Sequence, residues 1–171
     1  MWLASPGPVR VGDEELYFVA RTNVAELSRN THNGPTLDPL ARQWRSEIGV
    51  GRLRLNGLVS LDAPYLSGAT LSTRPFIFTG RRLLLNVDAG GGGSVVVELH
   101  RATAGDGDNQ SIALLTSLPL THNGVELEVL WHGAPKSGGN ATACGAFAGT
   151  PVRLTLRMRD CNIYSFQFVD Y

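Results

Sequence analysis

Residues 152–168, VRLTLRMRDCNIYSFQF, decide the fold. Apolar and polar side chains alternate over 152–159, and a second alternation with three aromatic residues runs over 164–168, which is the period of half-buried strands. Asp160, Cys161 and Asn162 separate the two runs, and residues of this kind favour a tight turn. The pattern predicts an antiparallel hairpin whose apolar face needs a second sheet to cover it, and therefore a β-sandwich.

Similar strand signals, separated by turn residues, recur along the rest of the chain. Asn56-Gly57 is a strong hairpin signal because both turn positions favour positive φ, so 49–55 is expected to pair with 58–61. The other predicted strands are 15–22, 69–72, 75–78, 82–87, 94–100, 112–120 and 125–131; residues 1–12 read as irregular, 41–47 as a short helix-like run, and 143–148 as one helical turn. These signals predict an all-β fold, an antiparallel two-sheet β-sandwich of jelly-roll type with an irregular N-terminal extension.

A long polar segment over 23–39 interrupts the pattern. A loop of this length is unusual inside a compact domain. We therefore expect two parts, an N-terminal extension over 1–47 and a β-sandwich domain over 48–171.

Composition and charge exclude several classes of partner. Fifteen basic and fifteen acidic residues cancel and form no basic block, so the charge supports binding neither to nucleic acid nor to an anionic membrane. No run approaches the ~18 apolar residues of a membrane span, and the first residues lack the pattern of a signal peptide. The chain is expected to be either a soluble intracellular protein or the tail of a longer secreted one. Glycosylation sequons at Asn109 and Asn140 favour the extracellular or secretory alternative without deciding localisation.

The metal-ligating residue types are few and scattered. Cys144 and Cys161 are the only cysteines, and their spacing does not decide between one disulfide and two buried thiols. The four histidines lack the short-range pairs of a zinc site, and His100 is expected at the surface near a strand end. They are His32, His100, His122 and His132. The sequence therefore predicts no metal site and no cofactor.

Three further patterns have an ordinary structural interpretation. Asp13, Glu14 and Glu15 could include a general acid, as the paired carboxylates of glycosidases do. Three adjacent acidic residues are usually solvated, however, and this interpretation is preferred. The run of four glycines at 90–93 lacks the lysine and the following helix of a phosphate loop, so it predicts a flexible hairpin turn. An arginine stripe offers charge for an anion, although outward charges on a strand more often keep a sheet soluble. The stripe comprises Arg101, Arg153, Arg157 and Arg159.

Exposed aromatic side chains are the remaining candidates, because sugar-binding surfaces stack such rings on pyranose faces. Trp131 is in phase with the apolar residues of 125–131 and is expected in the core. Tyr65 and Trp44 are the better candidates for exposure. The sequence does not determine a set of carbohydrate-binding residues.

Five segments, taken in order, resemble a known family. They are DEELYF at 13–18, IGVGRLRLNGLVSL at 48–61, GATLSTRPF at 68–76, AGTPVRL at 148–154 and LRMRDCNIYSFQF at 156–168. They are similar to the C-terminal part of five-bladed-propeller glycosidase-like proteins, nearest to glycoside hydrolase family 32, the invertase and levanase type, and its uncharacterised relatives. The resemblance implies that 16–20 is a last propeller strand and that a β-sandwich follows the catalytic propeller. Asn56-Gly57-Leu58 departs from the more usual Asp-Gly-Phe.

The resemblance implies a non-catalytic accessory β-sandwich domain that stabilises, or docks on, the catalytic propeller of a glycoside hydrolase-like parent protein. The family's catalytic carboxylates lie on earlier blades, so no residue of this chain matches them, and whether the protein is an enzyme stays open. Docking predicts one exposed apolar patch. The alternative is a free-standing lectin-like module that binds carbohydrate on a concave sheet face near Tyr65 or Trp44. A free-standing hydrolase ranks last, because no nucleophile–base pair is visible.

Overall fold

The protein is described from a computed structural model. The structure describes residues 2–3, 7–23, 45–102, 113–132 and 140–171. It divides the chain into two compact units, Met1–Leu55 and Asn56–Tyr171, so the division falls later than the expected one between 47 and 48. The described strand pairings are all antiparallel, which confirms the all-β class. Among the helical segments of this described part, none is long and apolar enough to be a membrane span.

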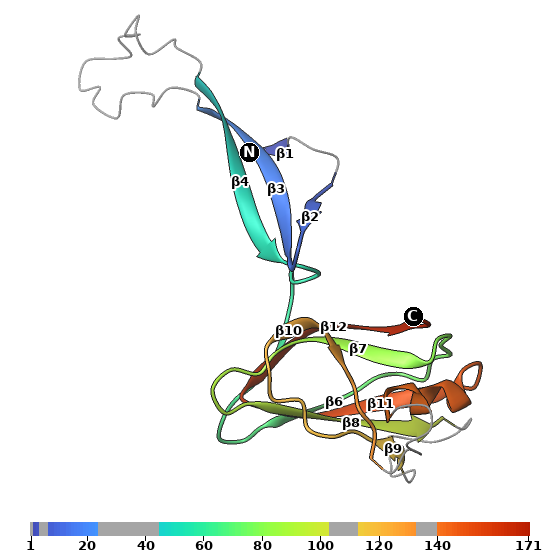
Figure 1. Cartoon of the computed structure of the whole chain (residues 1–171). Coiled ribbons are helices and arrows are strands. Elements are labelled where there is room, and N and C mark those ends of the chain that lie inside the picture. The colour runs from blue at the N-terminus through green and yellow to red at the C-terminus, as the bar shows by residue number, and fades with distance from the viewer. Residues whose placement is uncertain (1, 4–6, 24–44, 103–112, 133–139) are drawn as a thin grey trace, which may run out of the picture. The chain divides into compact units, whose positions relative to one another are not determined.

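The N-terminal unit is a four-stranded sheet built around β3 (Figure 1). Its strands are β1 (Trp2–Leu3), β2 (Val9–Val11), β3 (Glu14–Asn23) and β4 (Arg45–Arg54). Strand β4 pairs with β3 along the whole length from Glu14 to Asn23, so β1 and β2 must share the opposite edge of β3. The prediction that 1–12 is irregular was therefore wrong for β1 and for β2, which both pair with β3.

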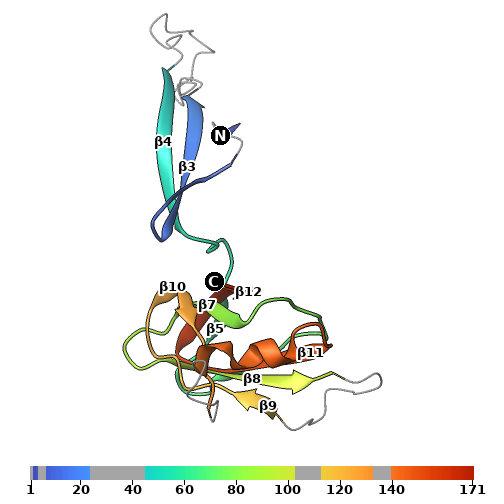
Figure 2. The ribbon, with the colours of Figure 1, turned by 45° about the vertical axis from the view of Figure 1, so that its right-hand side comes forward.

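The second unit is a sandwich of two four-stranded sheets (Figures 1 and 2). One sheet has the order β10-β7-β12-β5, and the other has the order β6-β11-β8-β9. The strands are β5 (Leu61–Ala63), β6 (Ala69–Ser72), β7 (Arg82–Asp88), β8 (Ser94–Arg101), β9 (Ala113–Thr116), β10 (Gly124–Glu128), β11 (Val152–Arg159) and β12 (Cys161–Val169), with a 3-10 helix η2 (Asn140–Phe147) before β11. Eight strands in this order form a jelly roll, as the sequence predicted.

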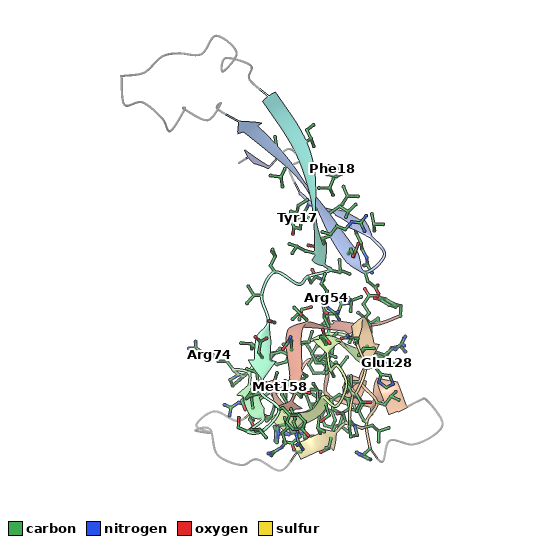
Figure 3. All side chains as sticks on the ribbon, turned by 90° about the vertical axis from the view of Figure 1, so that its left-hand side faces the viewer. Tyr17, Phe18, Arg54, Arg74, Glu128 and Met158 are labelled. Carbon is green, nitrogen blue, oxygen red and sulfur yellow. The ribbon has the colours of Figure 1, made fainter. Side chains whose placement is uncertain are left out.

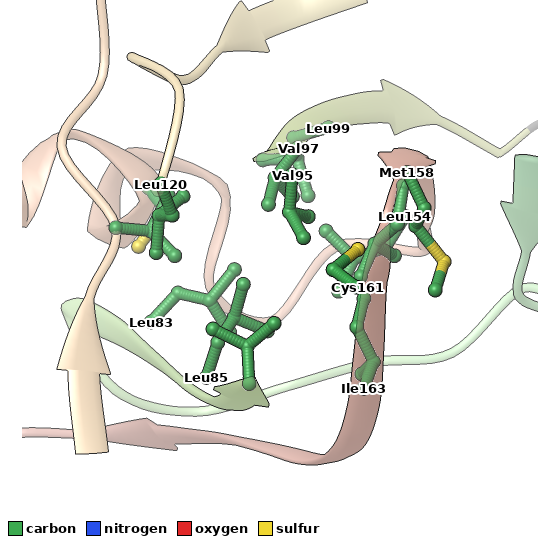
Figure 4. Close-up of a cluster of buried hydrophobic side chains, with 14 of the residues drawn as sticks. Leu83, Leu85, Val95, Val97, Leu99, Leu120, Leu154, Met158, Cys161 and Ile163 are labelled. Carbon is green, nitrogen blue, oxygen red and sulfur yellow. The ribbon is translucent and has the colours of Figure 1, made fainter. Parts of the chain in front are cut away.

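The core lies between the two sheets. The inward side chains of β7 (Leu83, Leu85, Val87) and of β8 (Val95, Val97, Leu99) are completely buried. Figure 4 shows Leu83 and Leu85 of β7 and the row of β8 together with Leu154, Met158 and Ile163 of β11 and β12. Trp131 is also completely buried, which confirms its predicted place in the core. The sandwich thus has a continuous apolar core, whereas Leu55 alone is buried among the described side chains of the N-terminal unit.

Strands β11 and β12 do not form the predicted hairpin. β11 pairs with β6 and β8, whereas β12 pairs with β5 and β7 in the other sheet. Asp160 alone connects them, with a φ of 48°. The apolar residues of the two strands therefore face one another across the core instead of sharing one face of one sheet. The alternation was identified correctly, but the pairing inferred from it was wrong, because burial is satisfied equally well in either arrangement.

The glycine run at 90–93 makes a second crossover of the same kind. It connects β7 to β8, which lie in different sheets, so the predicted hairpin turn was also wrong. The two crossovers run side by side, since Ser94 pairs with Arg159 in one sheet and Asp88 pairs with Asn162 in the other. A Cβ at Gly93 would lie only 2.1 Å from the carbonyl oxygen of Asp160. Gly93 is therefore required by the close approach of the second crossover.

Further local predictions were wrong for related reasons. Asn56-Gly57 does not join a hairpin, because β4 pairs with β3 and β5 pairs with β12. Residues 75–78 form no strand, and Phe76 makes a single bridge with Val152. In the helix-like run 41–47, residues 45–47 belong to β4 and the others lie outside the described residues, as does most of the predicted loop over 23–39. The helical turn predicted at 143–148 corresponds to η2.

Candidate functional site

The acidic run at 13–15 does not form an acid–base pair. Adjacent strand residues point to opposite faces, so Glu14 and Glu15 of β3 are directed apart. Glu14 lies 3.5 Å from Arg52 of β4. Glu15 accepts a 2.8 Å hydrogen bond from the hydroxyl of Tyr17, which raises the pKa of that phenol. Both carboxylates therefore contact neighbours within the N-terminal sheet.

Two of the predicted stripe arginines are engaged within the sandwich. Arg157 donates hydrogen bonds of 2.8 and 3.3 Å to the two carboxylate oxygens of Glu98 on the neighbouring strand. This contact, supported by His100 at 3.4 Å, holds the pKa of Glu98 below its usual value despite partial burial. His100, expected at the surface, is half-buried in this cluster. Arg159 donates to the carbonyl of Tyr65 at 3.0 Å.

Tyr65 is exposed, as predicted, at 54 % of its surface. The guanidinium of Arg159 lies 4.8 Å from the centre of its ring, so a cation–π contact occupies one face. Trp44, His32 and the sequon at Asn109 lie outside the described residues. Of the two aromatic candidates for stacking on a sugar, the structure therefore describes Tyr65 alone, with one face of its ring covered by Arg159.

The two cysteines are buried free thiols. Cys144 of η2 donates to the carbonyl of Arg81 at 3.0 Å, and burial raises the pKa of this thiol to about 11. Cys161 donates to the carbonyl of Ser94 at 3.5 Å, and burial also raises its pKa. In the described ranges no three potential ligands come close enough to hold a metal. The thiols therefore act as packing groups of the core.

The N-terminal sheet has one markedly apolar face, which sequence reasoning did not locate. Residues paired across strands share a face, so the register places Leu16, Phe18 and Ala20 of β3 beside the apolar residues of β2 and β4. We call this surface the apolar face; it comprises Val9, Val11, Leu16, Phe18, Ala20, Ile48 and Val50 (Phe18 is labelled in Figure 3). The same register places Glu14, Arg52 and Arg54 on the apolar face, beside Val11, Leu16 and Val9. The opposite face carries Arg10, Glu15, Tyr17, Val19, Gly49, Gly51 and Leu53. Aliphatic side chains are therefore more numerous on the apolar face than on the opposite face, although neither face is uniformly apolar or polar.

A polar groove of about 260 Å³ lies on the outer face of the sandwich sheet that contains β7. Its floor includes Asn86, which is 2 % exposed and follows three leucines in the central strand β7. We call it the Asn86 groove; it is lined by Asn56, Leu84, Asn86, Val125, Glu126, Ser165, Phe166 and Gln167. A buried asparagine inside an apolar strand was the sequence signal for this groove, because Asn is depleted from strands.

A larger hollow of about 340 Å³ lies beside β10. Leucines and a proline make most of its wall, with His122, Asn123 and Glu128 as its polar members. Glu128 is already bonded to Arg82 of β7, and this contact raises the pKa of the arginine. The hollow therefore offers few polar groups that could orient a ligand.

No protein family, curated protein or solved structure matches this chain.

Proposed function

We propose that this chain is a non-catalytic accessory module of a glycoside hydrolase-like protein, and that the apolar face of its N-terminal sheet docks on the catalytic propeller. From the resemblance the proposal takes a catalytic propeller followed by a β-sandwich, but it assigns 16–20 to a docking sheet and not to the propeller, because β3 is paired with β1, β2 and β4. Its structural support is the exposure of the apolar face. Val9, Val11, Ile48 and Val50 are 49, 53, 73 and 53 % exposed. β-Branched residues gathered on one side of a sheet are typical of a surface that another layer covers.

The described part of the N-terminal unit does not cover the side chains of these exposed residues. Among its described side chains, Leu55 alone is buried. Strand pairing alone makes a sheet only marginally stable in water, and a small sheet gains stability when its hydrophobic face packs against another element. A partner that covers the face would supply the missing hydrophobic stabilisation.

The shape of the surface favours another sheet as the partner. Strands β3 and β4 pair over ten residues each, so the face is extended and regular. Sheets pack face to face at about 10 Å through interdigitating apolar side chains. At one end the Glu14–Arg52 ion pair and Arg54 lie beside Val9 and Val11, so the expected contact is mixed polar and apolar there. A blade of a propeller is a sheet of this kind.

Hydrogen exchange of the 171-residue chain tests the proposal directly. In the isolated chain we expect the amides of β3 and β4 to exchange much faster than those of β7, β8 and β11, because a sheet without a core opens readily. Adding a recombinant invertase-type propeller domain should slow exchange in β3 and β4 at least tenfold, since a ligand stabilises the state it binds.

Val50→Asp should abolish this added protection by placing a charge in the apolar contact. Val59→Asp is the matched control, because Val59 is also exposed but lies in the second unit. The proposal would be contradicted if adding the propeller left exchange in β3 and β4 unchanged. It would also be contradicted if the propeller slowed exchange in Val50→Asp as much as in Val59→Asp.

A further inference from the structure

The sandwich departs from regular pairing on both sides of Asn86. The partner strand β12 shifts register between Ile163 and Ser165, and the opposite partner β10 shifts between Gly124 and Leu127. The register pairs Asn86 directly with Ser165, so both shifts occur beside the same residue of β7. β-Bulges are enriched next to binding and active sites, where they redirect side chains. Both register shifts lie at the level of Asn86 in the central strand β7, one in each neighbouring strand.

These shifts assemble the polar wall of the Asn86 groove. Ser165 and Gln167 pair with Asn86 and Leu84, so their side chains share the outer face of the sheet. On the other side, the shift in β10 contains Val125 and Glu126, both of which line the groove. Three strands thus bring amide, hydroxyl and carboxylate groups to one hollow.

The chemistry of these groups defines the class of ligand. Side-chain amides and hydroxyls both donate and accept hydrogen bonds, whereas a carboxylate such as that of Glu126 only accepts. Neither lysine nor arginine is among the lining residues, and Arg82, on the same face of β7, is bonded to Glu128 and to the carbonyl of Tyr171. Such a groove suits a neutral molecule with several hydroxyl groups and disfavours an anion.

We infer that the Asn86 groove is a binding site for a neutral polyhydroxylated ligand, of the size and chemistry of one monosaccharide unit. Tyr65 is not among the residues that line this site, and the site lies in a different unit from the proposed docking face. Ser165 and Gln167 contribute hydrogen bonds on one side, and Glu126 accepts hydroxyl protons on the other. Because the groove is small and open, the expected dissociation constant is about 1 mM or weaker.

Amide chemical shifts of the full chain provide the test, with glucose, mannose and galactose as neutral probes and glucuronate as the charged one. We expect saturable shifts at residues 125–126 and 165–167 for at least one neutral sugar below about 50 mM. Ser165→Ala and Gln167→Ala should each weaken binding about three- to tenfold, the effect of one lost hydrogen bond. Glucuronate should bind more weakly than glucose, and Glu126→Gln should reduce that difference.

Ser72→Ala is the matched control, since Ser72 is exposed on β6 of the other sheet and should leave binding unchanged. The spectra also show whether each variant is folded, so a lost response in an unfolded variant is not mistaken for a lost site. Absence of saturable shifts for all three neutral sugars would overturn the inference. Shifts that centre on Tyr65, or binding that survives both Ser165→Ala and Gln167→Ala, would overturn it as well.

Discussion

Replacing Gly93 by alanine should destabilise the sandwich more than an alanine at any other position of the glycine run. The new Cβ would lie 2.1 Å from the carbonyl oxygen of Asp160, 3.0 Å from its carbonyl carbon and 3.1 Å from the Cα of Ala89. All three atoms belong to the backbone, so no side chain can rotate away to make room. One crossover between the sheets must move to accommodate the methyl group.

The magnitude follows from what must move. Inserting a methyl group into a well-packed site typically costs 1–3 kcal/mol, and we expect about 3 kcal/mol for Gly93→Ala because the obstacle is main chain. For a domain of this size, such a loss lowers the melting temperature by about 10 °C. Gly92 provides the comparison, because a Cβ there meets no atom within 4 Å. Gly92→Ala should be neutral or more stable by about 0.5 kcal/mol, since it restricts the unfolded chain.

Urea unfolding followed by tryptophan fluorescence measures the difference. Trp131 is completely buried in the sandwich, so its emission reports on this unit. Changing Trp2 and Trp44 to phenylalanine removes the other two tryptophans from the signal. If Gly93→Ala and Gly92→Ala unfold with free energies within about 0.5 kcal/mol of each other, the side-by-side packing of the two crossovers is refuted.

Three further predictions concern single groups of the sandwich. Because Arg157 holds the pKa of Glu98 below its usual value, their contact stabilises the fold above the unfolded-state pKa of about 4.3, and this contribution is lost as the pH falls through the lower folded-state pKa. Glu98→Gln should therefore flatten the pH dependence of the urea midpoint below about pH 5. Burial raises the pKa of Cys144 to about 11, so mass spectrometry should show its thiol unmodified by iodoacetamide until the chain unfolds. Ser117→Ala should cost about 1–3 kcal/mol in urea unfolding, because the buried hydroxyl accepts a 2.8 Å hydrogen bond from the amide of Val97.

Each of these has a contrary result. Equal pH slopes for the wild type and Glu98→Gln would show that the carboxylate has the same pKa in the folded and unfolded states. Rapid alkylation of Cys144 in the native chain would contradict its burial. Ser67 is an exposed serine, so a Ser117→Ala variant as stable as Ser67→Ala would exclude the hydrogen bond as a stabilising contact.

Much of the fold could be predicted because alternation records which side chains are buried. The inward residues of β11, Val152, Leu154, Leu156 and Met158, are all buried. Alternation does not record which strand lies alongside, however. Asp160 has the positive φ of a turn residue, yet it connects two sheets and not two neighbouring strands. The hairpin prediction failed because the partners of β11 and β12 are distant in sequence.

The Asn56-Gly57 signal failed for a different physical reason. Asn56 does adopt a positive φ of 50°, as the dipeptide favours. The preceding strand β4 is nevertheless paired over its whole length with β3, and the following strand β5 is only three residues long. Ten pairings with β3 outweigh a local turn preference, so the positive φ redirects the chain without forming a hairpin.

The candidate sites were harder to predict because their residues come together only through the register. The acidic run and the arginine stripe were visible in the sequence, but Glu14, Glu15, Arg157 and Arg159 all contact neighbours in the folded chain. The apolar face required the pairing of β3 with β4, which a long intervening segment separates. The local sequence therefore revealed the charged residues, but it did not reveal the apolar face, whose residues come from strands that are distant in sequence.

The sandwich itself limits where a ligand could bind. Its interior is filled by apolar side chains, among them Trp131, Phe78 and the two cysteines, so in the described part of the sandwich the polar groups available to a ligand lie outside this core. On the outer face of the β6-β11-β8-β9 sheet, Glu98, His100 and Arg157 already contact one another. The other outer face is hollowed at Asn86, where the pairing on both sides is irregular. The groove thus lies where the strand register is irregular and polar side chains are exposed on the sheet. Ser165 and Gln167 are the residues to vary first, because they line the groove beside this irregularity.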